Sequence, residues 1–327
     1  MTAATHTDIF LSCDWGTSKF RLRLISVKNM ETLAQEISDW GIQKTNLLWK
    51  ENHRSTVSRE QFFGDVVLDH LQRLAQKTEI ALTAIPLLLS GMASADIGIK
   101  PLPYKKLPLL TDGSDLLTQF FTCGATKIFL ISGVSSPDDV MRGEETQLIG
   151  AFSQIKEKKL PHCFIIPGTH TKHIFVKQEK VISFKTYLTG ELFALLSEKS
   201  ILQNSLAKPT HTEAEIDITL FKKGLYDSME KNLLHSLFGV RTRALFHMHS
   251  PIENYYYLNG LLIGAELQDL LLNTSDCHFH LIASSLLARY YTLALQTFNI
   301  PFSMHDSEAA LIHGQHEIYC KQQEIIH

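Results

Sequence analysis

The chain has 327 residues, of which 44% are hydrophobic and 20% charged, which is enough material for two hydrophobic cores of roughly 150 residues each. Lysine and arginine total 31 against 34 for aspartate and glutamate, and like charges do not cluster. This composition excludes the basic surface typical of nucleic-acid-binding proteins and indicates two lobes with a small-molecule partner.

The five cysteines are scattered and form no CxxC pair, which favours reduced thiols over a disulfide framework or a zinc site. Residues 1–7 lack the pattern of a secretion signal, and no run of about 18 apolar residues occurs, so we expect a cytoplasmic protein without membrane contact. The histidine pairs His247 with His249 and His278 with His280 are interpreted as surface or half-buried positions, because no third metal ligand follows.

The first expected elements form a β-hairpin. Residues 9–13 are apolar, residues 14–18 read Asp-Trp-Gly-Thr-Ser, and residues 20–27 alternate apolar side chains with arginines. This pattern predicts a strand, a tight turn and a second strand. Ser58 and Gln61 then have the spacing of a capping box, which predicts a helix of about five turns.

Two buried strands are expected at residues 85–89 and 127–131, because each is a short apolar run that ends at Ser-Gly. We expect both to present polar loops on the same side. Between them, the prolines of residues 101–108 predict an extended, irregular segment. The apolar spacing after Gly143 predicts a helix.

The second half repeats this order of elements without repeating the sequence. Residues 163–166, 174–176 and 181–184 are predicted strands, with a turn rich in glycine and threonine at residues 167–172. A helix is expected from about residue 189.

Three longer helices are predicted in the remaining chain. The first covers residues 212–237 and begins at a capping box formed by Thr212 and Glu215. The other two cover residues 257–272 and 284–298.

The turn at residues 14–18 has the features of a phosphate-binding site. Gly16 lets a phosphate approach backbone N–H groups, and Thr17 and Ser18 add hydroxyl donors. Asp14, at the strand end, could hold Mg²⁺ through water. An ordinary hairpin turn explains these residues equally well.

A second turn of this kind covers residues 167–172. Gly168 gives access to the backbone, Thr169 offers a hydroxyl, and Lys172 adds a positive charge. Two such turns in successive lobes could hold a nucleotide from both sides. His170 by itself is more typical of a structural hydrogen bond than of a catalyst.

Residues 138–147 place four carboxylates and an arginine after the second buried strand. A carboxylate can accept the proton of a substrate hydroxyl during phosphoryl transfer, and Arg142 could neutralise an anionic substrate. Glu144 and Glu145 could instead do no more than complement the dipole of a helix that begins there.

The sequence resembles the 2-dehydro-3-deoxygalactonokinase family from about residue 8 to residue 318. The shared motifs are CDWGTS with Arg21, GMAS at residues 91–94 with Pro103-Tyr104, DVMRGEETQLIGA at 139–151, IPGTHTK at 166–172, FKTYLTGELFALL at 184–196 and LNGLLIGAEL at 258–267. DVMRGEETQ, and PGTHTK followed by TGELF, are specific to the family, whereas DWGTS is shared by the wider superfamily.

The resemblance implies an α/β fold with two ribonuclease-H-like domains, as in the actin, hexokinase and Hsp70 superfamily, and a nucleotide cleft between them. The expected domains are residues 1–157, with the first phosphate turn and the substrate loops, and residues 158–327, with the second phosphate turn and the adenosine site. The implied reaction uses ATP and Mg²⁺ to phosphorylate the 6-hydroxyl of 2-dehydro-3-deoxy-D-galactonate. The family also suggests a homodimer.

The resemblance further implies roles for individual residues. The first phosphate turn consists of Asp14, Gly16, Thr17 and Ser18, with Asp14 as the metal ligand. The second turn consists of Gly168, Thr169 and Lys172. Ser284 and Ser285 stand where the superfamily often has glycines that pack on adenine. The expected substrate-binding residues are Gly91, Met92, Ser94, Tyr104 and Arg142.

The GEE stretch at residues 143–145 also resembles exopolyphosphatases of the same superfamily. This likeness favours Glu145 as the general base, with Glu144 second and Asp139 third. Arg142 is then expected to hold the substrate carboxylate or to stabilise the charge of the transferring group.

Residues 94–99 depart from the family, which usually has Gly-Ser-Arg-Gln-Gly-Trp where this chain has Ser-Ala-Asp-Ile-Gly-Ile. If this loop binds the sugar acid, Asp96, Ile97 and Ile99 should change substrate preference, because polar contacts supply most discrimination. Two other functions stay open. One is a phosphohydrolase of polyphosphate or a nucleotide, and the other is a sensor that binds a sugar acid or nucleotide without turnover.

Overall fold

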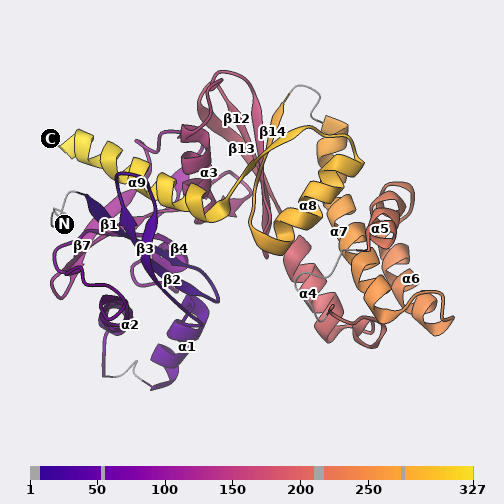
Figure 1. Cartoon of the computed structure of the whole chain (residues 1–327), viewed down its shortest axis with the longest axis horizontal. Coiled ribbons are helices and arrows are strands. Elements are labelled where there is room, and N and C mark those ends of the chain that lie inside the picture. Colours follow the sequence, from indigo (N-terminus) through magenta and orange to yellow (C-terminus); the bar gives the residue numbers. More distant parts are fainter. Residues whose placement is uncertain (1–7, 53–55, 210–216, 274–276, 327) are drawn as a thin grey trace. The chain divides into compact units, whose positions relative to one another are not determined.

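The computed structural model describes residues 8–52, 56–209, 217–273 and 277–326, as drawn in Figure 1. The chain forms two compact units. The first consists of Met1–Lys158, Gln178–Ser183 and Ser307–His327, and the second of Lys159–Lys177 and Phe184–Asp306.

The first unit contains a six-stranded sheet with the order β3-β2-β1-β4-β8-β7. Strands β1, β2 and β3 are antiparallel neighbours, whereas β4 runs parallel to β1 and β8 parallel to β4. The predicted hairpin is confirmed, and so is the prediction that two buried strands end on the same side. The strands are β1 (Ile9–Trp15), β2 (Phe20–Ser26), β3 (Thr32–Ser38), β4 (Leu87–Gly91), β7 (Thr118–Cys123) and β8 (Thr126–Ile131).

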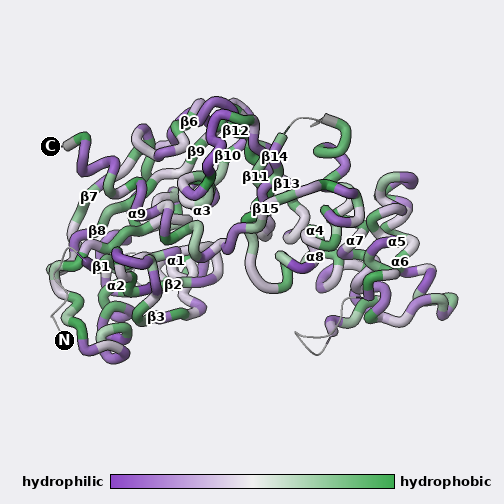
Figure 2. Tube along the Cα trace, turned by 45° about the horizontal axis from the view of Figure 1, so that its top comes forward, coloured by the Kyte–Doolittle hydropathy of each residue, from purple (hydrophilic) through white to green (hydrophobic). Residues whose placement is uncertain are grey.

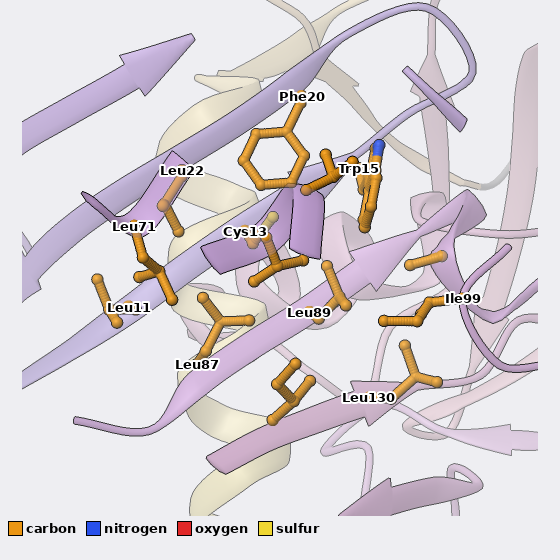
Figure 3. Packing of buried hydrophobic residues seen from close by; sticks show 14 of the residues in the cluster. Leu11, Cys13, Trp15, Phe20, Leu22, Leu71, Leu87, Leu89, Ile99 and Leu130 are labelled. Carbon is orange, nitrogen blue, oxygen red and sulfur yellow. The ribbon is translucent and has the colours of Figure 1, made fainter. Parts of the chain in front are cut away.

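The core of this unit combines side chains of the sheet with those of helix α2. Figure 3 shows Leu11 and Leu87 near Leu71 of α2, and the Trp15 indole meets the Phe20 ring edge-on with centroids 4.9 Å apart. The Ser58 hydroxyl accepts a hydrogen bond from Gln61 N at 3.2 Å, which confirms the predicted start of α2. The helices are α1 (Ile42–Asn52), α2 (Arg59–Ala75), the 3₁₀ helix η1 (Met92–Ser94), α3 (Glu144–Ser153) and α9 (Ser307–Ile326).

Helix α9 packs closely on α3, the helix predicted after Gly143 (Figure 1). Their backbones meet at two glycines. A Cβ atom on Gly150 would lie 1.9 Å from Ala310 O, and one on Gly314 would lie 1.8 Å from Thr146 O. The two helices therefore approach as closely as their backbones allow.

Gln315 on α9 also reaches the sheet. Its Nε2 donates to Cys13 O at 2.9 Å and to the Ser90 hydroxyl at 2.8 Å. The expected division into residues 1–157 and 158–327 places α9 with the second unit, whereas the structure places it with the first. The physical reason is that α9 packs on α3 and forms hydrogen bonds to β1 and β4, although it follows the second unit in the sequence.

The sheet of the second unit has the order β15-β14-β11-β12-β13. Strand β11 is antiparallel to β12 and parallel to β14, and β15 is parallel to β14. Strand β13 begins in the first unit, where Lys180 and Val181 pair with β6 (Leu109–Leu110). The strands are β11 (His162–Ile166), β12 (Thr171–Lys177), β13 (Lys180–Tyr187), β14 (His278–Ile282) and β15 (Phe302–His305).

Leaving aside the edge strands β7 and β6, each sheet has five strands in the same order: three strands consecutive in the chain, with two further strands added parallel to the first of them. This is the arrangement expected of ribonuclease-H-like domains, and the predicted α/β fold class is confirmed. The helices of the second unit are α4 (Thr189–Lys199), the 3₁₀ helix η2 (Gln203–Ser205), α5 (Ile218–Glu230), α6 (Leu233–Leu245), α7 (Pro251–Asn273) and α8 (Ser285–Thr297).

The single helix predicted at residues 212–237 is wrong. The structure has two helices, α5 and α6, because the Asn232 side chain accepts a hydrogen bond from His235 N at 3.2 Å and starts a new helix. Asp217 caps α5 in the same way through Leu220 N. The proposed capping box at Thr212 and Glu215 lies outside the described residues.

The described trace alternates hydrophobic and hydrophilic stretches, green and purple in Figure 2. Among the described residues, no helix combines the length and the apolar character needed to cross a bilayer. None of the five cysteines is part of a disulfide bond.

Three histidines form a hydrogen-bonded row across β11, β14 and β15. His162 Nδ1 lies 3.0 Å from His280 Nε2, and His280 Nδ1 lies 3.0 Å from His305 Nε2. The interpretation of His280 as a surface or half-buried residue is wrong, because it is buried by the neighbouring strand residues. Burial, followed by the nearby His305, His162 and His278, lowers the pKa of His280 to about 3.

Acid is expected to destabilise the protein through His280. The folded state keeps this imidazole neutral down to about pH 3, whereas the unfolded chain binds a proton below about pH 6.5, so stability is lost as the pH falls below 6.5. His280→Gln keeps a donor and an acceptor but cannot take up the proton. In urea unfolding, the free energy of unfolding of wild type should fall by about 2 kcal/mol relative to that of the variant between about pH 7 and 5. A pH-independent difference would contradict this.

Candidate active site

Three loops of the first unit meet beyond the ends of β1 and β4. A Cβ atom on Gly91, whose φ is +85°, would lie 2.9 Å from Trp15 O and 3.2 Å from Asp14 Oδ1. A Cβ atom on Gly143, whose φ is +109°, would lie 3.4 Å from Gly91 Cα. These glycines allow the Asp14 carboxylate, the loop after β4 and the N-terminus of α3 to come together.

Asp14 is the acidic residue of the first predicted phosphate turn. Its Oδ2 accepts a hydrogen bond from Arg21 Nη1 at 2.8 Å, and its side chain is 23% exposed. Among the residues that the structure describes, no group of three or more acidic, histidine or cysteine side chains is arranged to hold a metal. Magnesium needs only one or two protein carboxylates when water and phosphate supply its other ligands, and Asp14 fits that requirement.

The first phosphate turn rests on the start of α1. The backbone N–H groups of Ile42 and Gln43 donate to Gly16 O and Thr17 O at 3.0 and 3.1 Å. Thr17 and Ser18 are exposed. The turn can therefore offer the exposed Thr17 and Ser18 hydroxyls to a phosphate, whereas Gly16 N already donates to Lys19 O at 3.0 Å.

Two glutamates fold back over the N-terminus of α3. Glu144 Oε2 accepts from Arg142 N at 2.9 Å, and both carboxylate oxygens of Glu145 lie 2.8 Å from Gly143 N. The Thr146 hydroxyl donates to Glu145 Oε1 at 3.1 Å. Both glutamates thus stabilise the helix start, which is the structural role that the sequence left open beside catalysis.

Glu145 also has the electrostatic character of a proton acceptor. Its side chain is buried, and this burial, followed by the charge of Glu144, raises the pKa of Glu145 to about 7. A carboxyl group with a pKa near the working pH is suited to general-base catalysis. Asp139, the third candidate, is half-buried, and its Oδ1 lies 2.7 Å from Val140 N.

A cavity of about 300 Å³ lies beside Arg142. Arg142 Nη1 donates to Ser94 O at 2.8 Å and to Ser94 Oγ at 2.5 Å, and its guanidinium lies 4.2 Å from the Tyr104 ring centroid. Its Nε is buried without a hydrogen-bond partner in the described part of the chain. The cavity is lined by Asp96, Pro101, Leu102, Pro103, Tyr104 and Arg142.

A small sheet brings Tyr104 and Arg142 together. Its order is β10-β9-β5, with β5 (Lys105–Lys106) directly after Tyr104 and β10 (Val140–Met141) directly before Arg142. Strand β9 is Val134–Ser135, and the preceding Gly133 is closely packed. A Cβ atom there would lie 2.4 Å from Met141 O and 2.9 Å from Tyr104 Cε1.

The second predicted phosphate turn lies between β11 and β12. The start of α4 packs against it, because a Cβ atom on Gly190 would lie 2.3 Å from Gly168 O, and Glu191 N donates to Thr169 O at 2.9 Å. The dipole of α4 therefore favours an anion near the turn. Lys172 is buried within β12, so a direct contact with phosphate would require its side chain to move.

The two serines ahead of α8 differ in backbone conformation. Ser284 is extended, and its hydroxyl donates to Asp306 Oδ2 at 2.7 Å. Ser285 is exposed and has a φ of +58°, in the left-handed region that favours glycine. The position that the superfamily often fills with glycine thus keeps a backbone suited to glycine.

Ser285→Gly is expected to stabilise the protein by about 0.5–1 kcal/mol, because glycine lacks the Cβ atom that is strained in this conformation. The matched Ser284→Gly should destabilise, because it removes the hydrogen bond to Asp306. Thermal unfolding of both variants measures the difference. A lower melting temperature for Ser285→Gly would contradict the assigned strain.

Known proteins are similar to this chain over most of its length. The family model described as 2-keto-3-deoxy-galactonokinase matches residues 14–318. The chain belongs to this family. A 2-dehydro-3-deoxygalactonokinase of Escherichia coli (strain K12) is 30% identical over 86% of this chain and 87% of its own. "Probable 2-dehydro-3-deoxygalactonokinase DgoK1" of Rhizobium meliloti (strain 1021) is 28% identical over 95% of this chain and 96% of its own.

A solved structure supports the 2-keto-3-deoxy-galactonokinase family assignment. The crystal structure of a protein from Sinorhizobium meliloti described as a 2-dehydro-3-deoxygalactonokinase has a TM-score of 0.77 and 26% identity, over 95% of both chains. The family resemblance of the sequence is confirmed, and the chain is an enzyme of a kinase family.

The structure of this 2-keto-3-deoxy-galactonokinase family member groups the predicted residues within each unit. Asp14, Gly91, Arg142 and Glu145 come together in the first unit, whereas the turn at Gly168 and Thr169 lies in the second. Sequence reasoning assigned no site role to Gly133 and Gly190, whose lack of a side chain lets loops approach one another. Their signals were the Ser-Gly that ends the second buried strand and the TGELF motif.

Proposed function

We propose that this enzyme transfers the terminal phosphoryl group of ATP to the 6-hydroxyl of 2-dehydro-3-deoxy-D-galactonate. The observation that carries the proposal is the meeting of Asp14, Gly91 and Gly143 in the first unit, beside a cavity that contains an arginine. The names of the relatives supply the substrate. A cytoplasmic location and a homodimer belong to the same proposal, the first supported by five cysteines that form no disulfide bond.

The cavity beside Arg142 is the proposed site for the sugar acid. Arg142 lines the cavity, where its guanidinium can donate to the substrate carboxylate, and the Tyr104 ring fixes the guanidinium plane. Asp96 lines the same cavity and can accept hydrogen bonds from sugar hydroxyls. Asp96 would repel a second acidic group, so we propose that it selects among sugar acids by their hydroxyl pattern.

The two turns are the proposed phosphate-binding elements of ATP. Thr17 and Ser18 of the first turn, and Gly168 and Thr169 of the second, would donate hydrogen bonds to phosphate oxygens, and Ser284 and Ser285 would lie near the adenosine. Asp14 would hold magnesium, which neutralises phosphate charge when it binds with ATP. Arg21 keeps the Asp14 carboxylate oriented through its 2.8 Å ion pair.

Glu145 is the proposed general base. Its raised pKa suits proton transfer from the 6-hydroxyl, and the hydrogen bond from Gly143 N fixes the carboxylate at the N-terminus of α3. Positioning of the acceptor and neutralisation of charge would supply most of the rate enhancement, as in other phosphoryl transfers. Glu144, whose carboxylate caps Arg142 N, is the second candidate and Asp139 the third.

The test is a screen of 2-keto-3-deoxy sugar acids and related aldonates with ATP and Mg²⁺, following ADP formation and the phosphorylated product. We expect the highest kcat/KM for 2-dehydro-3-deoxy-D-galactonate. Phosphate release at full rate without any sugar acid would identify a phosphohydrolase. Ligand binding by calorimetry without product would identify a sensor. Light scattering of the purified protein tests the homodimer.

A further inference from the structure

A buried carboxylate in the second unit has no part in the roles above. Glu266 on α7 is buried, and its Oε1 lies 2.9 Å from His173 Nε2 on β12. Its Oε2 accepts hydrogen bonds from the Tyr291 hydroxyl, at 2.7 Å, and from the Thr189 hydroxyl. A buried carboxylate is costly unless such contacts compensate for lost water, so this network fixes all four side chains.

The partners of Glu266 surround the second phosphate turn. Thr171 is the first residue of β12, directly after the turn, and its Oγ1 lies 3.1 Å from the Tyr291 hydroxyl. Thr189 is the first residue of α4, directly before Gly190, which packs on Gly168 O. One carboxylate therefore joins the strand that leaves the turn to the helix against which the turn packs.

We propose that Glu266 is a positioning residue for the second phosphate turn and thereby for ATP. It acts through Thr189 and through Tyr291 with Thr171, and its own carboxylate touches no substrate. Without it, the start of β12 and the start of α4 lose their common anchor, and the backbone donors near Gly168 lose their fixed geometry. This inference rests on the proposed phosphate-binding role of the turn.

A purely structural role for Glu266 predicts a different result. Structural damage lowers the melting temperature and the amount of active enzyme, but leaves the affinity of the correctly folded fraction unchanged. Loss of positioning instead weakens ATP binding while the sugar-acid site in the first unit keeps its affinity. Comparing the change in KM for ATP with the change in KM for the sugar acid therefore distinguishes a positioning role from a structural one.

Glu266→Ala is expected to raise KM for ATP about tenfold and to change KM for the sugar acid less than about twofold. Glu266→Gln, which keeps one acceptor oxygen, should recover part of the loss. Asp269→Asn is the matched control, because Asp269 lies on the same helix and accepts hydrogen bonds from the Tyr187 hydroxyl, at 2.7 Å, and from Lys185 Nζ. Calorimetry with ATP alone should show the same loss of affinity as the kinetics.

If Glu266→Ala does not fold, Thr189→Val and Tyr291→Phe test the same connections with smaller changes. Each should weaken ATP binding while the melting temperature falls little. Folded variants that all bind ATP with unchanged affinity would overturn the inference. Failure of the proposed function would look different, because wild type would then bind ATP but phosphorylate none of the sugar acids.

Discussion

Glu145→Gln is expected to lower kcat by about 10²–10⁴-fold with little change in either KM. Glutamine can still accept the hydrogen bond from Gly143 N, which Glu145 accepts at 2.8 Å, so the start of α3 should keep its structure. What the variant loses is a group that can take up the proton of the acceptor hydroxyl. Steady-state kinetics with saturating ATP and sugar acid measure this loss.

The pH dependence gives an independent check on Glu145. A base acts in its deprotonated form, and the pKa of Glu145 is raised to about 7, so kcat/KM of wild type should rise through about pH 7 and then level off. Stability should change in the opposite direction. The folded state favours the protonated carboxyl of Glu145. The contribution of Glu145 to the free energy of unfolding is therefore present at low pH and lost as the pH rises through 7. The free energy of unfolding of Glu145→Gln should therefore rise by about 2–3 kcal/mol relative to that of wild type between about pH 5 and 8.

If Glu145 is not the general base, two further variants identify the residue that is. Glu144→Gln and Asp139→Asn remove the other candidate carboxylates and should each leave most of the activity. A Glu145→Gln enzyme with wild-type turnover would exclude Glu145 from proton transfer. A large loss in Glu144→Gln alone would assign the role to the half-buried neighbour.

Gly314→Ala is expected to destabilise the protein by about 3 kcal/mol and to reduce activity as well. The added methyl would lie 1.8 Å from Thr146 O on α3, so α9 and α3 must move apart. The gain in helix propensity, about 1 kcal/mol, offsets only part of this cost. Because α3 carries Glu145 at its first turn, the displacement should also disturb the active site.

Gly239→Ala is the matched control for this prediction. It also adds a methyl within a helix, α6, but the nearest atom would be Arg243 Nη1 at 2.9 Å, the end of a side chain and not a backbone atom. Thermal unfolding and kcat should therefore stay close to wild type. Equal melting temperatures for the two variants would contradict the close backbone contact between α3 and α9.

Local signals made part of the fold predictable from the sequence. The hairpin around Gly16 and the start of α2 at Ser58 depend on residues close together in the chain, and the structure confirms both. The break between α5 and α6 also had a local signal, the capping side chain of Asn232, but the apolar spacing continues across it and suggests one helix. Competing local patterns therefore limit such predictions.

The rest of the fold and site depends on contacts between distant residues. The return of α9 to α3 joins Gly314 to Thr146, and no short pattern in either segment encodes that pairing. The motifs located Glu145 and the turn at Gly168, yet neither the burial of Glu145 nor the anchoring of the turn by Glu266 follows from spacing. The motifs therefore located the candidate residues, but the surroundings that set the pKa of Glu145 could not be predicted from the sequence.

The return of α9 has a consequence for how the protein is made. A ribosome releases the chain from its N-terminus, and domains generally fold as they emerge. The segments of the second unit end at Asp306, so that unit can be complete while the first still waits for Ser307–His327. We therefore expect the first unit to mature only after α9 has been synthesised, and nascent chains stalled before α9 to depend on chaperones.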